Sequence, residues 1–309
     1  MVHDMIRRAA ALLVPLAFGA AGVLGACGSS ASSTGSAGGT SGDGRLLVVT
    51  TTTQITDFVR NVGGDLVEVH PLLKPNVDPH DFEPSAADLV ALREADVIVE
   101  NGVGLEHWFA STVASAEPSG AIVDASQGVT VVDDDPHIWQ DPTNAAIMAT
   151  NIADALAAAD ATDAATYRSN LAAYTAQLTA LDAEIQAQID TLTNKKVVTN
   201  HDAFAYYVDR YGLDFVGSVI PSFDTQAELS PADVRELVDR IRDEGVKAIF
   251  TEESLPPKTA EAIAAEAGVE VVGGDAGLYG DSLGPAGSDG DTYLKMMRHN
   301  TKAIVDNLR

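Results

Sequence analysis

A stretch without helix breakers divides this sequence into two halves. Residues 164–192 contain neither glycine nor proline, and apolar side chains recur there at every third or fourth position. They are Leu171, Tyr174, Leu178, Leu181, Ile185 and Ile189. This spacing is typical of one face of an α-helix, and a helix of this length extends roughly 43 Å, which exceeds the usual helix of a globular domain. The stretch therefore predicts one stiff helix that connects two α/β halves.

The residues before this helix alternate between strand-like runs and helical patterns. Strands are predicted at 46–50, 67–72, 97–99, 122–124 and 129–132, and helices at 54–62, at 105–113, at 144–159 and directly after Ser85. Ser85 and Asp88 have the spacing of a capping box, which marks the start of that helix. Strands that alternate with helices favour a mostly parallel sheet with helices on its faces.

The residues after the long helix repeat this alternation. Strands are predicted at 196–199, 215–220, 248–251 and 270–272, and helices at 203–211, 231–244, 257–267 and 292–308. The predicted fold class is therefore α/β, with two lobes of mostly parallel sheet flanked by helices. We expect an N-terminal lobe at 45–163, the connecting helix at 164–192 and a C-terminal lobe at 193–309. Because bending the helix would break backbone hydrogen bonds, we expect only small movements between the lobes.

The N-terminus has the organisation of an exported lipoprotein precursor. Arg7 and Arg8 precede an uncharged apolar run at 9–26, which ends in the sequence LGAC. This ending resembles the lipobox of bacterial lipoproteins, and it predicts a signal peptide at 1–26, a lipid anchor on Cys27 and a location at the outer face of the cell membrane. A single-pass membrane anchor is the alternative, because such a helix needs ~20 residues. Residues 27–44, rich in Gly, Ser and Thr, are predicted to form a flexible tether.

Charge and cysteine content exclude several classes of function. The net charge is −26 and the isoelectric point is about 4.3, which argues against a nucleic acid partner, since phosphate binding needs clustered Lys and Arg. An acidic surface suits an exported protein that meets cations, although it also serves solubility alone. Cys27 is the single cysteine, so neither an internal disulfide nor a thiolate metal site is expected.

Three histidines and a carboxylate follow predicted strands. His80, His137 and His201 each come after such a run, and the glycine-rich loop 273–290 after the last strand offers Asp281, with Asp275 as the alternative. Ligands bind at the carboxyl ends of parallel strands, so we expect these side chains to converge. Three imidazoles and one carboxylate suit Zn²⁺, or Mn²⁺ where oxygen donors contribute more. Binding requires neutral imidazoles, which predicts that affinity falls below about pH 6.5.

The spacing of the three histidines fits no short metal motif. The alternative is that each of the three is a solvated or hydrogen-bonded residue without a ligand role. We expect His70, His107 and His299 to be residues of that kind. We expect the carboxylates around His80, which are Asp78, Asp81 and Glu83, to support that histidine or to be solvated rather than to be ligands.

The residues around the three histidines carry a resemblance to a known family. The sequences are DPHDFEP at 78–84, HIWQDP at 137–142, HDAF at 201–204, VKAIFTE at 246–252 and GDSL at 280–283. They resemble, in order, the motifs of the zinc/manganese solute-binding proteins of ABC importers. The resemblance covers residues 45–309. It implies two α/β lobes joined by one long helix, an ABC permease as partner, and metal ligand roles for His80, His137, His201 and Asp281. We expect the protein to be a monomer.

The resemblance also bears on the choice of metal. Manganese members of this family commonly have glutamate at the third ligand position and zinc members commonly have histidine, so His201 favours Zn²⁺, with Mn²⁺ as the alternative. The histidine-rich loop found in many zinc members is absent here, which leaves manganese open. The sequence has Asp133, Asp134 and Asp135 before His137 instead, a run that we expect to be mainly solvated.

Two enzymatic hypotheses compete with metal capture. The sequence GDSLG at 280–284 fits the G-x-S-x-G elbow of serine hydrolases around Ser282, with Asp289 and His299 downstream, but no strand directly precedes it and glycine and proline follow it. A metallohydrolase would need an open metal position and a general base, for which Glu83, Glu252 or Glu253 are available. Neither pattern is complete, so we predict that the protein is not an enzyme.

Overall fold

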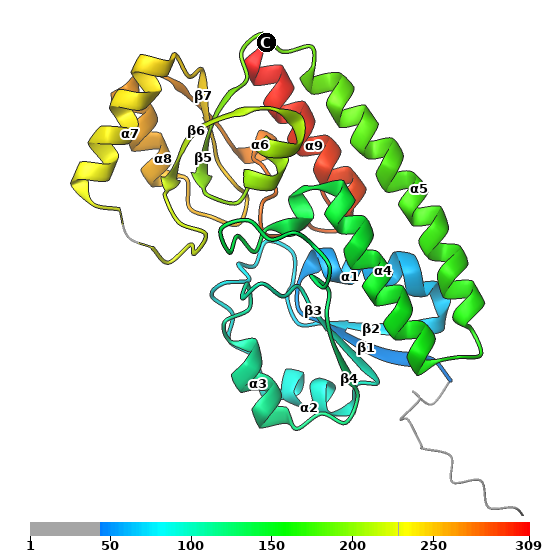
Figure 1. Cartoon of the computed structure of the whole chain (residues 1–309). Helices are drawn as coiled ribbons and strands as arrows, with labels where there is room; N and C mark the ends of the chain where they lie inside the picture. The colour runs from blue at the N-terminus through cyan, green and yellow to red at the C-terminus, as the bar shows by residue number, and fades with distance from the viewer. Residues whose placement is uncertain (1–43, 228) are drawn as a thin grey trace, which may run out of the picture. The chain divides into compact units, whose positions relative to one another are not determined.

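The computed structural model describes residues 44–227 and 229–309, which belong to one compact unit (Figure 1). The predicted signal peptide, Cys27 and all but the last residue of the predicted tether lie outside these residues. Within the described part, no helix combines the length and the apolar composition needed to cross a membrane.

The first sheet is built entirely from parallel strands. Its order is β2-β1-β3-β4. The strands are β1 (Leu46–Thr50), β2 (Val67–Pro71), β3 (Val97–Glu100) and β4 (Ala121–Asp124). The helical segments are α1 (Thr53–Gly63), η1 (Gly64–Leu66), α2 (Ala86–Glu94), α3 (Phe109–Ala116), η2 (Ile138–Gln140) and α4 (Pro142–Ala159). Helix α2 begins with the predicted capping box of Ser85 and Asp88.

The second sheet repeats this arrangement, with the order β6-β5-β7-β8 and parallel pairing throughout. The strands are β5 (Lys196–His201), β6 (Asp214–Ile220), β7 (Ala248–Phe250) and β8 (Glu270–Val272). The helical segments are α6 (Ala205–Tyr211), α7 (Pro231–Glu244), α8 (Lys258–Ala267), η3 (Gly274–Ala276) and α9 (Tyr293–Leu308). The predicted α/β class with two parallel sheets is therefore confirmed.

Helix α5 (Ala164–Ile189) links the two lobes (Figure 1). It has 26 residues, which corresponds to about 39 Å, and it ends three residues before the predicted end at Leu192. It packs against α1 and α4 of the first lobe and against α6 and α9 of the second. The apolar positions read from the sequence form its buried face, with Tyr174, Leu181 and Ile189 at most 1% exposed.

One apolar core extends through both lobes. Buried residues from α1, α4, α5 and α9 join residues from strands of each sheet in a single cluster, in which Trp139, Tyr167 and Tyr293 are fully buried. Two smaller clusters lie elsewhere, one around Val49 and Leu92 in the first lobe and one in the second. A hinge that separated the lobes widely would expose part of the shared core, which would cost free energy in proportion to the apolar area exposed.

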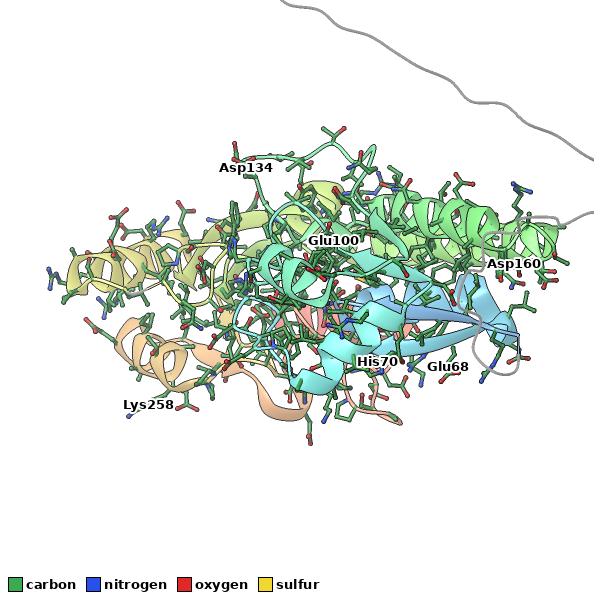
Figure 2. The ribbon with its side chains drawn as sticks, turned by 90° about the horizontal axis from the view of Figure 1, so that it is seen from below. Glu68, His70, Glu100, Asp134, Asp160 and Lys258 are labelled. Carbon is green, nitrogen blue, oxygen red and sulfur yellow. The ribbon has the colours of Figure 1, made fainter. Side chains whose placement is uncertain are left out.

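Two further details of the sequence prediction are wrong. Residues 129–132 form no strand, and α3 begins at Phe109 rather than near Leu105. Val132 is 54% exposed and its amide donates to the Tyr206 hydroxyl instead of to a neighbouring strand. Asp133 and Asp134 then adopt left-handed backbone angles, with φ of 51° and 60°, which β-strands do not contain. The loop with Asp134 lies at the outer edge of the view in Figure 2.

Candidate metal centre

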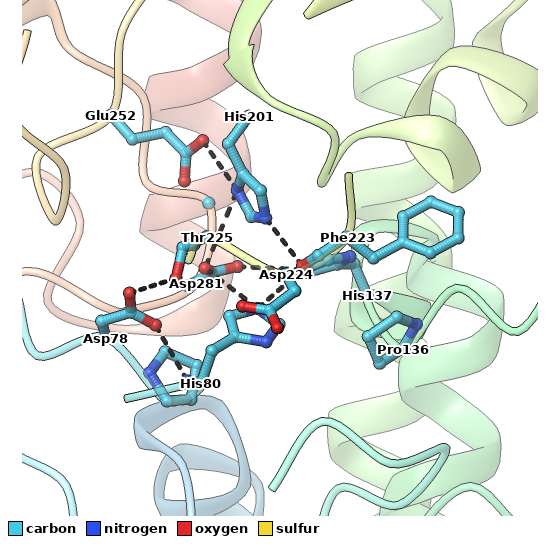
Figure 3. Close-up of polar contacts among 12 residues, drawn as sticks. Asp78, His80, Pro136, His137, His201, Phe223, Asp224, Thr225, Glu252 and Asp281 are labelled. Carbon is cyan, nitrogen blue, oxygen red and sulfur yellow. Dashed lines mark hydrogen bonds and ion pairs between the residues drawn. The ribbon is translucent and has the colours of Figure 1, made fainter. Parts of the chain in front are cut away.

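Four polar side chains meet where the carboxyl edges of the two sheets face each other (Figure 3). His80 lies in the loop after β2, His137 lies directly before η2, His201 is the last residue of β5, and Asp281 lies in the loop after η3. One potential ligand atom from each lies within 4.8 Å of the others. Their side chains are 0–2% exposed. The structure thus brings together all four residues that the sequence singled out.

The distances within this group suit donors around one ion. His137 Nε2 lies 3.2 Å from Asp281 Oδ1, and His80 Nε2 lies 3.5 Å from Asp281 Oδ2. The two Nε2 atoms are 3.4 Å apart, and His201 Nδ1 is 3.8 Å from Asp281 Oδ2. Ligands that each lie about 2.0–2.2 Å from a metal are separated by about 3–4 Å from one another.

Asp281 shows the strongest sign that the group needs a cation. Both of its carboxylate oxygens are buried and neither receives a hydrogen bond from the described residues. A buried carboxylate without donors is costly unless a positive charge lies beside it. The two oxygens of Asp281 lie 3.2 and 3.5 Å from the nearest imidazole nitrogens, so a divalent ion among these atoms would offset the carboxylate charge. The residues present therefore fit a metal ion.

The loop that carries Asp281 is held from several elements. The Gly280 carbonyl accepts hydrogen bonds from Trp139 Nε1 and Gln140 Nε2, each at 3.2 Å, and from Gln54 Nε2 at 3.5 Å. These donors belong to the first lobe, so they fix the second-lobe loop across the lobe boundary. Asp275, the alternative ligand, is exposed in η3 and stays outside the cluster.

His80 and His137 are each supported by an aspartate two residues earlier. Asp78 Oδ1 accepts from the amide of His80 at 2.8 Å. Asp135 Oδ1 accepts from the amide of His137 at 2.9 Å and lies 2.6 Å from its Nδ1. Because a carboxylate only accepts, His137 Nδ1 donates and its Nε2 faces the cluster, an arrangement common for metal-binding histidines. Asp135 is 1% exposed, so the expectation of a mainly solvated acidic run is wrong for this residue.

His201 lies between a carboxylate and a backbone carbonyl. Its Nδ1 is 3.2 Å from Glu252 Oε1, and its Nε2 is 3.1 Å from the Phe223 carbonyl oxygen. Glu252 lies two residues after the end of strand β7, and its side chain is fully buried. A side chain at Gly280 would overlap Glu252 Oε2, so glycine is required there for the Glu252 carboxylate to fit. The sequence prediction treated Glu252 only as a possible general base and missed this contact.

The buried charges shift the pKa values of the cluster. Burial alone would lower the pKa of His137, but the Asp281 carboxylate and the hydrogen bond to Asp135 raise it to about 8. Burial opposes the charge of His201 as well, and Asp281 and Glu252 together raise its pKa to about 10. Although burial favours protonation of Asp281, His201 and His137 hold its pKa well below the usual value. Burial raises the pKa of Glu252, against the effect of His201.

The other candidate residues lie outside this cluster. Asp81, Glu83, His107 and Glu253 are exposed, and His70 on β2 lies 3.5 Å from Asp88. The Ser282 hydroxyl accepts from the amide of Asn76 and donates to the Leu283 carbonyl. His299 instead contacts the Gly277 carbonyl, so Ser282 and His299 do not form the serine–histidine contact that a hydrolase requires.

Two parallel-sheet lobes, one long linking helix and a buried imidazole–carboxylate cluster between the lobes define a metal-binding solute-binding protein. The model of the family described as ZnuA, the periplasmic zinc-uptake complex component A, matches residues 48–307. The chain belongs to this family, which confirms the resemblance stated from the five motifs. Members are substrate-binding proteins of ABC importers and are not enzymes, in agreement with the prediction.

Curated relatives match over most of their length. The metal ABC transporter substrate-binding lipoprotein SsaB of Streptococcus sanguinis is 31% identical over 286 residues, which is 87% of this chain and 91% of the relative. The manganese ABC transporter substrate-binding lipoprotein PsaA of Streptococcus pneumoniae is 31% identical over 285 residues, covering 87% and 90%.

Solved structures share the fold. The periplasmic zinc-binding protein TroA of Treponema pallidum superposes with a TM-score of 0.80 at 30% identity, over 86% of this chain and 99% of TroA. A manganese-bound mutant of the periplasmic metal-binding protein of Candidatus Liberibacter asiaticus gives a TM-score of 0.78 at 26% identity, over 86% of this chain and all of that one.

Proposed function

We propose that the protein captures one divalent transition-metal ion with His80, His137, His201 and Asp281 and delivers it to the permease of an ABC importer. The observation that carries this proposal is the buried group of four ligand atoms within 4.8 Å of one another. The two buried oxygens of Asp281, which have no hydrogen-bond partner among the described residues, support it. Three imidazoles and one carboxylate make a four-ligand site whose side chains are 0–2% exposed, which favours binding of the ion over turnover of a substrate.

Mn²⁺ is our first candidate for the ion. PsaA of S. pneumoniae, which is 31% identical to this chain, is named for manganese, and so are the similar lipoproteins of Streptococcus mitis and Streptococcus gordonii. These names favour manganese over the zinc prediction that rests on His201.

Zn²⁺ is the second candidate, because a specific observation favours it. The four converging side chains offer three nitrogen donors and one carboxylate, and zinc prefers such a nitrogen-rich set more than manganese does. TroA, the structural relative at 30% identity, is named for zinc.

The capture chemistry follows from the charges. An incoming ion replaces protons on the imidazoles, since only neutral imidazole offers a lone pair to a metal. Asp281 contributes the negative charge, and it is ionised before the ion arrives because its pKa is depressed. Asp135 keeps the ring of His137 oriented through Nδ1, so Nε2 faces the ion without rearrangement.

We also propose how the chain is organised around this site. Residues 1–26 serve as a lipoprotein signal peptide, Cys27 carries the lipid and residues 27–44 tether the fold to the outer face of the membrane. Residues 45–163 and 193–309 form the two lobes, with 164–192 between them, and one protein molecule docks on the permease. The relatives named as lipoproteins support the anchor.

The test combines metal analysis with ligand substitution. Elemental analysis of the protein purified from its host, followed by Mn²⁺ and Zn²⁺ titrations in competition with a chelator, identifies the ion. His137→Ala is expected to weaken binding of either ion at least about 100-fold, since it removes a ligand and leaves Asp135 unpaired. His107→Ala, at an exposed histidine outside the cluster, is the matched control. Unchanged binding in His137→Ala would remove this histidine from the site.

A further inference from the structure

A segment of the second lobe, residues 221–227, crosses to the first lobe beside the metal centre. It follows β6, and we call it the crossing segment. Its Phe223 carbonyl accepts from His201 Nε2 at 3.1 Å, and the Phe223 ring lies 6.3 Å from the ring of His137. Thr225 reaches Asp78, the residue that holds the backbone of His80 (Figure 3). The crossing segment is therefore connected to all three histidines.

Asp78 joins two separate contacts through its two oxygens. Oδ1 accepts from the His80 amide at 2.8 Å, and Oδ2 accepts from Thr225 Oγ1 at 2.6 Å. The first contact lies within the loop of one ligand, and the second spans 147 residues of sequence between the lobes. Thr225 is 9% exposed, so this hydrogen bond to a charged acceptor is largely shielded from water and is stronger than an exposed one.

A second contact across the same boundary is much weaker. Gln226 Nε2 lies 3.5 Å from Asp81 Oδ2, and both side chains are exposed. A hydrogen bond at that length and exposure contributes little. The Asp78–Thr225 bond is therefore the main polar contact between the crossing segment and the loop that carries His80.

We propose that Asp78 and Thr225 are positioning residues that set the rate at which the ion enters and leaves the site. The proposal rests on the proposed function of metal capture. The ligand side chains are 0–2% exposed, so an ion reaches them only when part of the surrounding structure moves. The crossing segment lies against His201 and is attached to the His80 loop by a single short hydrogen bond. Breaking that bond frees the segment without removing any ligand.

The consequence is a kinetic signature. If the bond holds the crossing segment in place in both the empty and the loaded protein, its loss speeds binding and release together and changes the dissociation constant little. A loss of ligand geometry would instead speed release alone. Removal of Asp78 also deprives the His80 amide of its acceptor, so an Asp78 variant adds weaker affinity to the faster exchange.

The experiment is a stopped-flow comparison of four variants of the full mature chain. Protein loaded with Mn²⁺, and separately with Zn²⁺, is mixed with excess EDTA, and release is followed by the fluorescence of Trp108 and Trp139. Association is followed by mixing empty protein with the same ions. Thr225→Val removes the hydroxyl at nearly constant volume, Thr225→Ser retains it, and Asp78→Ala removes the acceptor. Thr179→Val, at an exposed threonine on α5, controls for the substitution itself.

Thr225→Val is expected to speed both association and release by about 10- to 100-fold, the factor that corresponds to a hydrogen bond with a charged acceptor. Thr225→Ser and Thr179→Val keep the original rates, and Asp78→Ala also raises the dissociation constant. The proposal is overturned if Thr225→Val exchanges ions at the original rate, if it speeds release alone, or if Thr225→Ser behaves like Thr225→Val. A mature chain that binds neither ion refutes the proposed function instead, which is a separate outcome.

Discussion

Metal binding at this site should release close to two protons at neutral pH. His201 Nδ1 lies 3.2 Å from Glu252 Oε1 and its Nε2 lies 3.1 Å from the Phe223 carbonyl oxygen, and two such acceptors fit a protonated ring. With pKa values of about 8 for His137 and about 10 for His201, the two side chains hold about 0.9 and 1.0 protons at pH 7. Each must give up one proton before it can bind the ion.

The number of protons released on metal binding distinguishes this site from one whose histidines have ordinary pKa values. Two ordinary histidines with a pKa of ~6.5 would together hold only about 0.5 protons at pH 7 and would release that number. The raised values predict a release of about 1.9 protons. The raised pKa values also shift the pH dependence of metal affinity. Affinity should keep rising between pH 7 and pH 9, whereas the sequence alone predicts a plateau above about pH 6.5.

Isothermal titration calorimetry measures this number directly. The observed binding enthalpy is plotted against the ionisation enthalpy of several buffers that do not bind the ion, and the slope gives the protons released. His107→Ala, which changes an exposed histidine, should leave the slope unchanged. A slope near 0.5 or below at pH 7 would show that His137 and His201 are already neutral. Asp281 would then not raise the pKa values of these histidines.

Three further predictions follow from the same geometry. The metal-free protein should lose roughly 3 kcal/mol of unfolding free energy between pH 7.5 and 9.5. The raised pKa values of His137 and His201 stabilise the fold fully below the unfolded pKa of ~6.5, and this stabilisation is lost as pH rises through about 8 and 10. Urea unfolding at the two pH values tests this prediction, and equal stability would contradict it. His201→Glu should raise the Mn²⁺/Zn²⁺ affinity ratio at least about tenfold, measured by chelator competition, and an unchanged ratio would show that this position does not select the ion. Empty and loaded protein should give nearly superimposable X-ray scattering profiles, because the lobes share one core; a large change in radius of gyration would rule out the stiff connection.

The fold could be predicted from the sequence because its signals are local. The unbroken apolar pattern on α5, the cap at Ser85 and the alternation of strands and helices are each visible within about 30 residues. The error at 129–132 shows where local signals fail, since a β-branched run becomes a strand only where a neighbouring strand offers hydrogen bonds. The Val132 amide finds the hydroxyl of Tyr206 instead, and this contact depends on where the second lobe lies.

The convergence of the four side chains could be predicted only in part from the rule that parallel strands place their carboxyl ends at one edge. The rule holds for His80 and His201, but the strand predicted before His137 does not form, and there the motif HIWQDP carried the prediction. The residues that support the four side chains could not be predicted. Asp135 and Asp134 are adjacent and chemically identical, yet one is buried against His137 and the other is exposed. Glu252 and Thr225 act on residues 51 and 147 positions away. Only the tertiary structure distinguishes such carboxylates and hydroxyls from solvated ones.

These supporting carboxylates bear on the choice of ion as much as the four ligands do. Three neutral imidazoles, Asp281 and a divalent ion leave a net charge of about +1 in a buried site, which is unfavourable unless a nearby negative charge offsets it. Asp135 lies behind His137, on the ring nitrogen that faces away from the cluster, and Glu252 lies beside Nδ1 of His201, so both carboxylates are close enough to supply that charge. A histidine backed by a carboxylate is a stronger donor than one hydrogen-bonded to a neutral group. Histidine at position 201 therefore does not by itself exclude Mn²⁺, because Glu252 places a carboxylate beside the position where manganese members of the family commonly have glutamate.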